Sequence, residues 1–312
     1  MTTIAEKRDQ DRDTVVFICD FSPPRGSDPA LLEGAQQIGA DFISVAYNPG
    51  KSTRVNSTLA AGWIQANTAQ DVLFALATRD MNKVAAESLL LGADLMGLQN
   101  VLVVGGDLFT EKELASVKSV DDFKPTELLG AIDSMNQGLD YRGRKLRSST
   151  SLCAGAAIDL SHDLERETRL TRRKAESGAS FFLMQPIFDP RRLSDFLEGY
   201  ERAYGEALAP PIFCGLQVMA PDSIVFGDIP GWVTDDLSRG RTGADIASKL
   251  LDDFVSAGIR SIYLVPPIVK GGRRDYEAAA SVIRSHRGYA PGATRVPGNP
   301  PFRYYLDGVR RH

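Results

Sequence analysis

Short apolar runs alternate along the chain with longer segments in which apolar residues recur every three to four positions. Uninterrupted apolar runs of strand length are typical of strands that are buried on both faces, as in a parallel sheet covered by helices. The predicted strands are Val15–Cys19, Phe42–Ala46, Val72–Ala77, Asn100–Val104, Leu152–Ala157, Phe181–Met184, Pro211–Leu216 and Ser261–Val265.

The segments between these runs have the spacing of amphipathic helices. The predicted helices are Ala30–Ile38, Thr58–Ala66, Met81–Met96, Pro125–Asn136, Leu164–Ser177, Arg191–Tyr204, Gly243–Ala257 and Arg274–Arg284. Gly39, Gly97, Gly178 and Gly258 each stand shortly before a predicted strand. A glycine just past a helix end can adopt the left-handed conformation that ends the helix. The repeated junction therefore indicates a series of βα units.

Eight βα units fit a single closed (β/α)8 TIM barrel, which we place at residues 15–287. A doubly wound sheet would more often show fewer strands and a Gly-x-Gly-x-x-Gly fingerprint after the first strand, and no such fingerprint is present. We expect residues 1–14 to be a flexible N-terminus. Residues 288–312 contain four prolines, so we expect a C-terminal extension that either packs on the barrel or forms a contact in a homo-oligomer.

Composition excludes several classes of protein. The formal net charge is −4 and the arginines are scattered, which does not fit a nucleic-acid-binding protein. Three cysteines lie far apart within apolar runs, so neither a disulfide framework nor a metal site is expected. No window approaches the roughly 20 apolar residues of a membrane span. These features predict a cytoplasmic protein that does not associate with membranes.

The clearest candidate for chemistry is Asn100–Asp107, where an apolar run stops at Gly105, Gly106 and Asp107. Functional residues of a (β/α)8 barrel come from the C-terminal ends of the strands and the loops that follow. Asp107 either presents its carboxylate at the barrel mouth or caps the next segment. The predicted strand ends are rich in carboxylates and amides, which suits recognition of a flat heterocycle better than acyl transfer.

Several of these strand ends resemble the methylenetetrahydrofolate reductase family. Asp-Phe-Ser-Pro-Pro-Arg at 20–25 is similar to the family's Glu-Phe-Phe-Pro-Pro-Lys/Arg phrase. The phrases at 43–49, 100–107 and 182–189 follow in the family's order, and Thr78–Asn82 resembles the branch that is fused to homocysteine methyltransferase domains. The resemblance covers roughly residues 15 to 285.

The resemblance implies an oxidoreductase of one-carbon metabolism. It would interconvert 5,10-methylenetetrahydrofolate and 5-methyltetrahydrofolate by hydride transfer from NADH or NADPH through FAD. Asp20 stands where the family has the glutamate that protonates N10 of the folate, and its side chain is one methylene shorter. Gln185 matches the glutamine that binds the pterin edge, and Asp107 matches the aspartate between flavin and folate, where its charge stabilises the iminium intermediate. The implied cofactor contacts are Asn48, Arg79, Asn82, Asp107, Arg173 and Lys174.

Four positions depart from the flavin side of the family pattern, at Ala46, Ala75, Ala157 and Leu170. Because these side chains cannot replace the polar contacts found in relatives, we expect FAD to be bound loosely. Three alternatives stay open: a flavin-free reductase with direct hydride transfer from NAD(P)H, a partner in pterin-dependent methyl transfer, and a non-catalytic folate-binding subunit of a methyl-transfer system. The sequence does not decide between NADH and NADPH, between the two directions of flux, or between oligomeric states.

Overall fold

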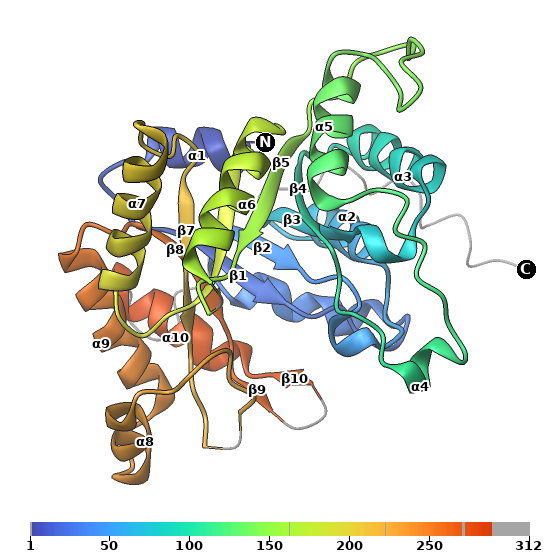
Figure 1. Cartoon of the computed structure of the whole chain (residues 1–312). Helices are drawn as coiled ribbons and strands as arrows, with labels where there is room; N and C mark the ends of the chain where they lie inside the picture. The colour runs from blue at the N-terminus through green and yellow to red at the C-terminus, as the bar shows by residue number, and fades with distance from the viewer. Residues whose placement is uncertain (1, 162, 222, 270–271, 289–312) are drawn as a thin grey trace, which may run out of the picture.

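The computed structural model describes residues 2–161, 163–221, 223–269 and 272–288. Its centre is a closed barrel of eight parallel strands that pair in chain order, with β1 also pairing with β8 (Figure 1). The strands are β1 (Val16–Phe21), β2 (Phe42–Val45), β3 (Asp71–Ala77), β4 (Asn100–Val104), β5 (Cys153–Ile158), β6 (Phe181–Pro186), β7 (Ile212–Gln217) and β8 (Ser261–Val265). The predicted (β/α)8 barrel is therefore confirmed.

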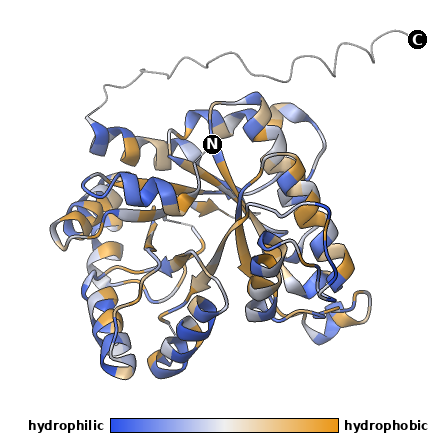
Figure 2. Cartoon of the chain, turned by 90° about the horizontal axis from the view of Figure 1, so that it is seen from above, coloured by the Kyte–Doolittle hydropathy of each residue, from blue (hydrophilic) through white to orange (hydrophobic). Residues whose placement is uncertain are grey.

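Helices surround this barrel. The α-helices are α1 (Ile4–Gln10), α2 (Ser57–Asn67), α3 (Lys83–Leu95), α4 (Glu111–Leu114), α5 (Pro125–Asn136), α6 (Leu164–Glu176), α7 (Arg191–Tyr204), α8 (Gly231–Ser238), α9 (Gly243–Ser256) and α10 (Tyr276–Arg287). The 3₁₀ helices are η1 (Pro29–Gln37), η2 (Pro49–Lys51) and η3 (Thr78–Asp80). Seen from above, apolar strands occupy the centre and the helices carry their polar residues outward (Figure 2).

Each barrel strand buries both of its faces, which explains the uninterrupted apolar runs. In β1, Phe17 and Cys19 belong to the large hydrophobic cluster between strands and helices. Val16 and Ile18 belong to a second cluster that fills the barrel interior. Alternate residues of one strand therefore serve two cores, as expected when helices cover a closed parallel sheet.

The interior is packed with side chains to a density that leaves little room for change. A Cβ added to Gly155 of β5 would lie 2.2 Å from the ring of Phe181, so this glycine makes space for the aromatic side chain. The Phe181 ring in turn packs edge-on against Phe213, with 6.4 Å between ring centroids. The barrel interior around these residues is thus a filled core and not a channel.

Helix α1 closes the N-terminal end of the barrel, opposite the end at which the β9–β10 hairpin lies (Figure 1). Thr3 and Glu6 form a capping box at its start, and Ile4 is fully buried in the interior cluster. The Ile4 amide donates to Oδ1 of Asn100 at 2.9 Å, and the Asn100 amide donates to a β3 carbonyl. The expectation that residues 1–14 are flexible is therefore wrong for α1, because one buried isoleucine and a buried amide anchor it.

A register shift between β6 and β7 shapes the opposite end of the barrel. A Cβ added to Gly215 would lie 2.4–2.5 Å from backbone atoms of Met184, Gln185 and Pro186. Glycine at this position lets the two strands approach closely where β6 is irregular. As a result, the side chain of Gln185 is exposed between the buried Met184 and Pro186.

The segment after β8 differs from its predicted course. Arg274 was expected to begin a helix, but it lies in β10 (Arg273–Arg274), which pairs antiparallel with β9 (Ile268–Val269). Helix α10 begins at Tyr276, where the Asp275 carboxylate accepts a hydrogen bond from the amide of Ala278. The expected extension at 288–312 lies outside the described residues apart from Gly288, which ends α10 in the left-handed conformation. No helix in the described part of the chain is long and apolar enough to cross a membrane.

Candidate active site at the barrel mouth

The candidate residues Asp20, Asn48, Arg79, Asn82, Asp107 and Gln185 all lie at or just beyond the C-terminal ends of strands. Because the strands are parallel and closed into a barrel, these ends share one mouth. Across the described residues, no cluster of three or more histidine, cysteine, aspartate or glutamate side chains could hold a metal ion. The candidate residues at this mouth carry amide, carboxylate and guanidinium groups.

Asp20, near the end of β1, is the most enclosed carboxylate of the mouth, and only 8% of its side chain is exposed. Its Oδ2 accepts a hydrogen bond from Nε of Arg274 at 3.0 Å, and Oδ1 accepts one from the Tyr263 hydroxyl at 3.2 Å. The Arg274 side chain is also buried, at 7% exposed. Asp20 therefore lies in a buried ion pair and not in an apolar pocket.

Two tyrosines lie near this pair, and Tyr263 contacts it directly. Burial, reinforced by the charge of Asp20, raises the pKa of Tyr263 well above its ordinary value. Tyr276 stacks on Phe21 with 4.9 Å between ring centroids, and its hydroxyl oxygen accepts from the amide of Ser22 at 3.0 Å. Both hydroxyls remain protonated near neutral pH, and Tyr263 acts as a hydrogen-bond donor to Asp20.

Arg79 organises the loop after β4. Its Nε and Nη2 donate to the two carboxylate oxygens of Asp80 at 2.6 and 2.7 Å, and its Nη1 donates to the backbone carbonyl of Asp107 at 2.6 Å. The guanidinium carbon lies 4.1 Å from the ring centroid of Phe109. The guanidinium donors of Arg79 thus have hydrogen-bond partners within the chain. Arg79 also positions the loop that presents the exposed carboxylate of Asp107.

Asn48 and Asn82 are both used by the local backbone. Asn48 has a left-handed conformation with a φ of 39°, and its Oδ1 accepts from the amide of Arg54 at 3.2 Å. Asn82 caps α3 by accepting from the amide of Ala85 at 2.9 Å. Beside Asn48, burial and the negative charge of Asp80 raise the pKa of Tyr47 to about 12. The two asparagines shape the mouth while their side-chain oxygens are engaged.

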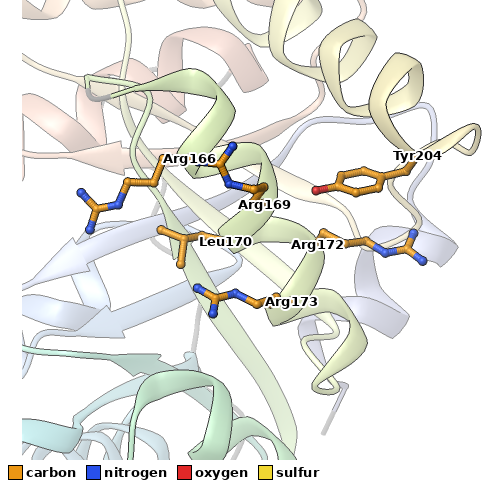
Figure 3. Close-up of a pocket in the computed structure, with 6 residues that line it drawn as sticks. All are labelled: Arg166, Arg169, Leu170, Arg172, Arg173 and Tyr204. Atoms are coloured by element: carbon orange, nitrogen blue, oxygen red, sulfur yellow. The ribbon is translucent and has the colours of Figure 1, made fainter.

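Arg173 and Lys174, adjacent in α6, lie in different surroundings. Lys174 donates to the carbonyl of Ala157 at 2.6 Å and forms a largely buried ion pair with Glu167 at 3.1 Å. Arg173 is exposed and lines a shallow hollow on the outer side of α6 (Figure 3). The residues that share this hollow are Arg166, Arg169, Leu170, Arg172 and Tyr204. The structure therefore does not bring Arg173 and Lys174 together on one ligand-binding surface.

These contacts test whether the residues fit a flavin. Arg79, Asn48, Asn82 and Lys174 have their principal hydrogen-bonding groups engaged within the chain. The four departures from the family pattern have apolar side chains and so add no polar group. Ala75 is buried in the barrel interior, and Leu170 lines the hollow on the outer side of α6. Asn82, Asp107 and Arg173 are exposed among the expected cofactor contacts, and the side-chain oxygen of Asn82 is engaged in capping α3. This set does not fit a tightly held flavin.

Two residues of the cluster around Asp20 were missed by the sequence analysis. Strand alternation could have indicated Tyr263, because a buried tyrosine at an inward position of β8 usually has a hydrogen-bond partner for its hydroxyl. Arg274 had no comparable signal, since its contact with Asp20 spans 254 positions of sequence and depends on a two-residue strand.

The fold is that of a (β/α)8 barrel, and its candidate ligand site lies at the C-terminal ends of the strands. The sequence model of methylenetetrahydrofolate reductase matches residues 5–264, and the chain belongs to that family.

Among solved structures, the chain resembles a protein from Clostridium thermocellum described as uncharacterized and binding two copies of 5-methyl-5,6,7,8-tetrahydrofolic acid. The TM-score is 0.62 at 13% identity, over 90% of this chain and 98% of that one. It also resembles riboflavin lyase, solved with modified FMN and riboflavin, with a TM-score of 0.55 at 11% identity over 91% and 94% of the two chains. At these identities the likeness concerns the fold alone. A comparison with curated protein sequences finds no match.

Proposed function

We propose that the protein interconverts 5,10-methylenetetrahydrofolate and 5-methyltetrahydrofolate, exchanging two electrons with NADH or NADPH. The proposal rests on the family match over residues 5–264 in a chain whose barrel mouth carries Asp20 and Gln185 at the ends of β1 and β6. The structural neighbour that binds a methylated folate supports a folate ligand.

In the reducing direction, the bond between N10 and the bridging carbon breaks as N10 takes a proton, which leaves a 5-iminium cation. A hydride then forms the third C–H bond of the N5-methyl group. Substrate, NAD(P)H and one proton thus give 5-methyltetrahydrofolate and NAD(P)⁺. The protein must supply a proton donor near N10 and negative charge near the iminium.

We assign proton delivery to Asp20 and iminium stabilisation to Asp107. Because both carboxylate oxygens of Asp20 are engaged by Arg274 and Tyr263, Asp20 can reach N10 only after the bound substrate has displaced one of these partners. The exposed carboxylate of Asp107 needs no such release. Gln185 offers one donor and one acceptor to the pterin edge from the irregular end of β6.

The test is turnover by the Asp20→Asn variant, with Asp235→Asn on the exposed face of α8 as the matched control. General acid catalysis is worth about 10²- to 10⁴-fold, so Asp20→Asn should lose that factor in folate-dependent NAD(P)H oxidation while Asp235→Asn keeps full activity. The binding of 5-methyltetrahydrofolate should change far less than turnover. Wild-type protein that neither binds nor turns over the folate would defeat the proposal, and tight binding without turnover would assign a non-catalytic folate-binding role.

For the flavin we propose FAD held loosely, so that the protein purifies partly colourless and gains activity when FAD is added. Each missing hydrogen bond weakens binding by about 0.5–1.5 kcal/mol, and loss of three corresponds to roughly ten- to a thousand-fold or more. The engaged polar groups at the mouth favour a second candidate, direct hydride transfer from the nicotinamide. Titration of flavin-free protein with FAD separates the two. Full activity without flavin, and no binding at high micromolar FAD, would establish direct transfer.

A further inference from the structure

Two loops run side by side at the rim of the mouth, one after β1 and one before α2. The amide of Val55 donates to the carbonyl of Pro24 at 2.9 Å, and Nη1 of Arg54 donates to the carbonyl of Pro23 at 2.9 Å. Arg25 follows directly in the first loop and is exposed. This pairing holds the side chains of Arg25 and Arg54 on neighbouring loops.

The β9–β10 hairpin brings a third arginine to the same place. Nη1 of Arg274 donates to the carbonyl of Gly272 at 3.2 Å. A Cβ added to Gly272 would lie 3.1 Å from Nη2 of Arg54, so Arg54 and Arg274 lie against the same glycine. Burial and the positive charges of Arg25 and Arg274 together lower the pKa of Arg54.

Negative charge does not balance this cluster. Asp20 pairs with Arg274 alone, and in the part of the chain that the structure describes no carboxylate forms an ion pair with Arg25 or Arg54. Asp28 and Asp275, which are close in sequence, accept hydrogen bonds from the amides of Ala30 and Ala278 and form no ion pair with the described arginines of this cluster. Three arginines thus lie on adjacent loops of the rim, and among the described residues their one ion pair is that between Arg274 and Asp20.

We propose that Arg25, Arg54 and Arg274 form an anion subsite at the rim of the barrel mouth, for a carboxylate or phosphate group of a ligand whose reactive part lies inside. Guanidinium groups bind carboxylates and phosphates through paired, charge-assisted hydrogen bonds. Such an anion replaces the repulsion among the three cations with attraction. It also competes with Asp20 for Arg274, which links binding at the rim to the charge balance at Asp20.

The identity of the anion rests on the proposed function. A folate supplies the carboxylates of its glutamate tail, whose number grows with each added γ-glutamyl residue. A nicotinamide cofactor supplies phosphates, and NADPH carries one more than NADH. The shared chemistry is a flexible anionic group tethered to a flat heterocycle.

The experiment compares full-length wild type with Arg54→Gln, Arg25→Gln and the control Arg202→Gln, an exposed arginine on α7. Dissociation constants are measured for 5-methyltetrahydrofolate as monoglutamate and triglutamate, and for NADH and NADPH. Tripolyphosphate serves as a probe without a heterocycle, followed by thermal denaturation.

If the folate tail occupies the subsite, wild type and Arg202→Gln should bind triglutamate about tenfold more tightly than monoglutamate. Arg54→Gln and Arg25→Gln should lose that preference. If a cofactor phosphate occupies it, the two variants should instead lose a preference for NADPH over NADH. Arg25 is exposed and makes no described hydrogen bond through its side chain, so Arg25→Gln stays informative even where Arg54→Gln unfolds.

Failure of the subsite and failure of the proposed function give different results. Tripolyphosphate that raises the melting temperature of wild type and Arg202→Gln, but not of Arg25→Gln, supports the subsite even where no folate binds. Folate turnover with affinities for all anions that are the same in all four proteins would overturn the subsite and leave the proposed function standing.

Discussion

The guanidinium of Arg274 lies 3.0 Å from the carboxylate of Asp20, and both side chains are more than nine-tenths buried. Asp20 is the penultimate residue of β1, and Arg274 belongs to the hairpin after the last barrel strand. The pair therefore joins the first and last parts of the barrel sequence where β1 lies beside β8, at the position expected to carry the acid chemistry.

We expect this pair to be strongly coupled. Removing one partner of a buried ion pair leaves an uncompensated charge and costs about 3–5 kcal/mol. Asp20→Asn and Arg274→Gln should each lower the free energy of unfolding, and the double variant should lose clearly less than the sum. Urea denaturation of the four proteins measures the coupling. The partly exposed Lys7–Asp11 pair gives the reference cycle, expected below about 1 kcal/mol, and a coupling at Asp20 no larger than that would contradict the prediction.

Two glutamines at strand ends should respond in opposite ways to replacement by leucine. The Gln185 side chain is exposed, so Gln185→Leu should leave thermal stability nearly unchanged and weaken folate binding by about 1–3 kcal/mol. Gln217 is buried, and its amide group bonds to the backbone of Ile224 and Phe226. Gln217→Leu should lower the melting temperature. Calorimetry with 5-methyltetrahydrofolate and thermal denaturation test both, and a sharp loss of stability in Gln185→Leu would assign that residue to the scaffold.

Gly215→Ala should be destabilising, because the new methyl group would meet backbone atoms of β6 that cannot move aside cheaply. Overpacking of this kind typically costs about 1–3 kcal/mol. The control is Gly199→Ala in α7, where a Cβ meets no atom within 4 Å and the helix should gain about 0.5–1 kcal/mol. Chemical denaturation of the two variants decides the matter, and equal stabilities would show that the approach of β6 and β7 is not constrained as described.

The Lys51–Glu113 ion pair predicts a local pH dependence. Hydrogen bonds from Lys51 and then Thr110 lower the pKa of Glu113 from its ordinary 4.5 to about 2. Since the pKa in the folded chain is below that in the unfolded chain, the pair stabilises the fold above about pH 4.5. That contribution is lost as the pH falls through about 2. Carbon-detected NMR titration should find this low midpoint in wild type and a higher one in Lys51→Met, and an unchanged midpoint would remove Lys51 as the cause.

The barrel was predictable because each of its strands carries its own local signal. The strands Asn100–Val104 and Ser261–Val265 and the helices Pro125–Asn136 and Arg191–Tyr204 begin and end where the sequence places them. In these segments apolar periodicity, turn residues and burial all favour the same structure. A segment can be predicted from sequence when its local preferences agree with its tertiary environment.

The elements that were missed depend on distant partners. Arg274 looks like the start of a helix until the hairpin places its guanidinium against Asp20. The mouth residues were predictable as a set, because the C-terminal ends of parallel strands must meet. Their hydrogen bonds were not, since nothing near Arg79 in sequence indicates that a carbonyl 28 positions later will occupy its Nη1.

Helix α1 has a consequence for the order in which the chain can assemble during synthesis. It leaves the ribosome before every barrel strand, yet the side chain that accepts from the Ile4 amide belongs to Asn100, which is made 96 residues later. The closing of the sheet must wait longer still, because β1 pairs with β8. The apolar side of α1 therefore stays exposed to solvent or chaperones while the first half of the barrel is translated. Helix α1 can dock only after β4 has taken its place in the sheet.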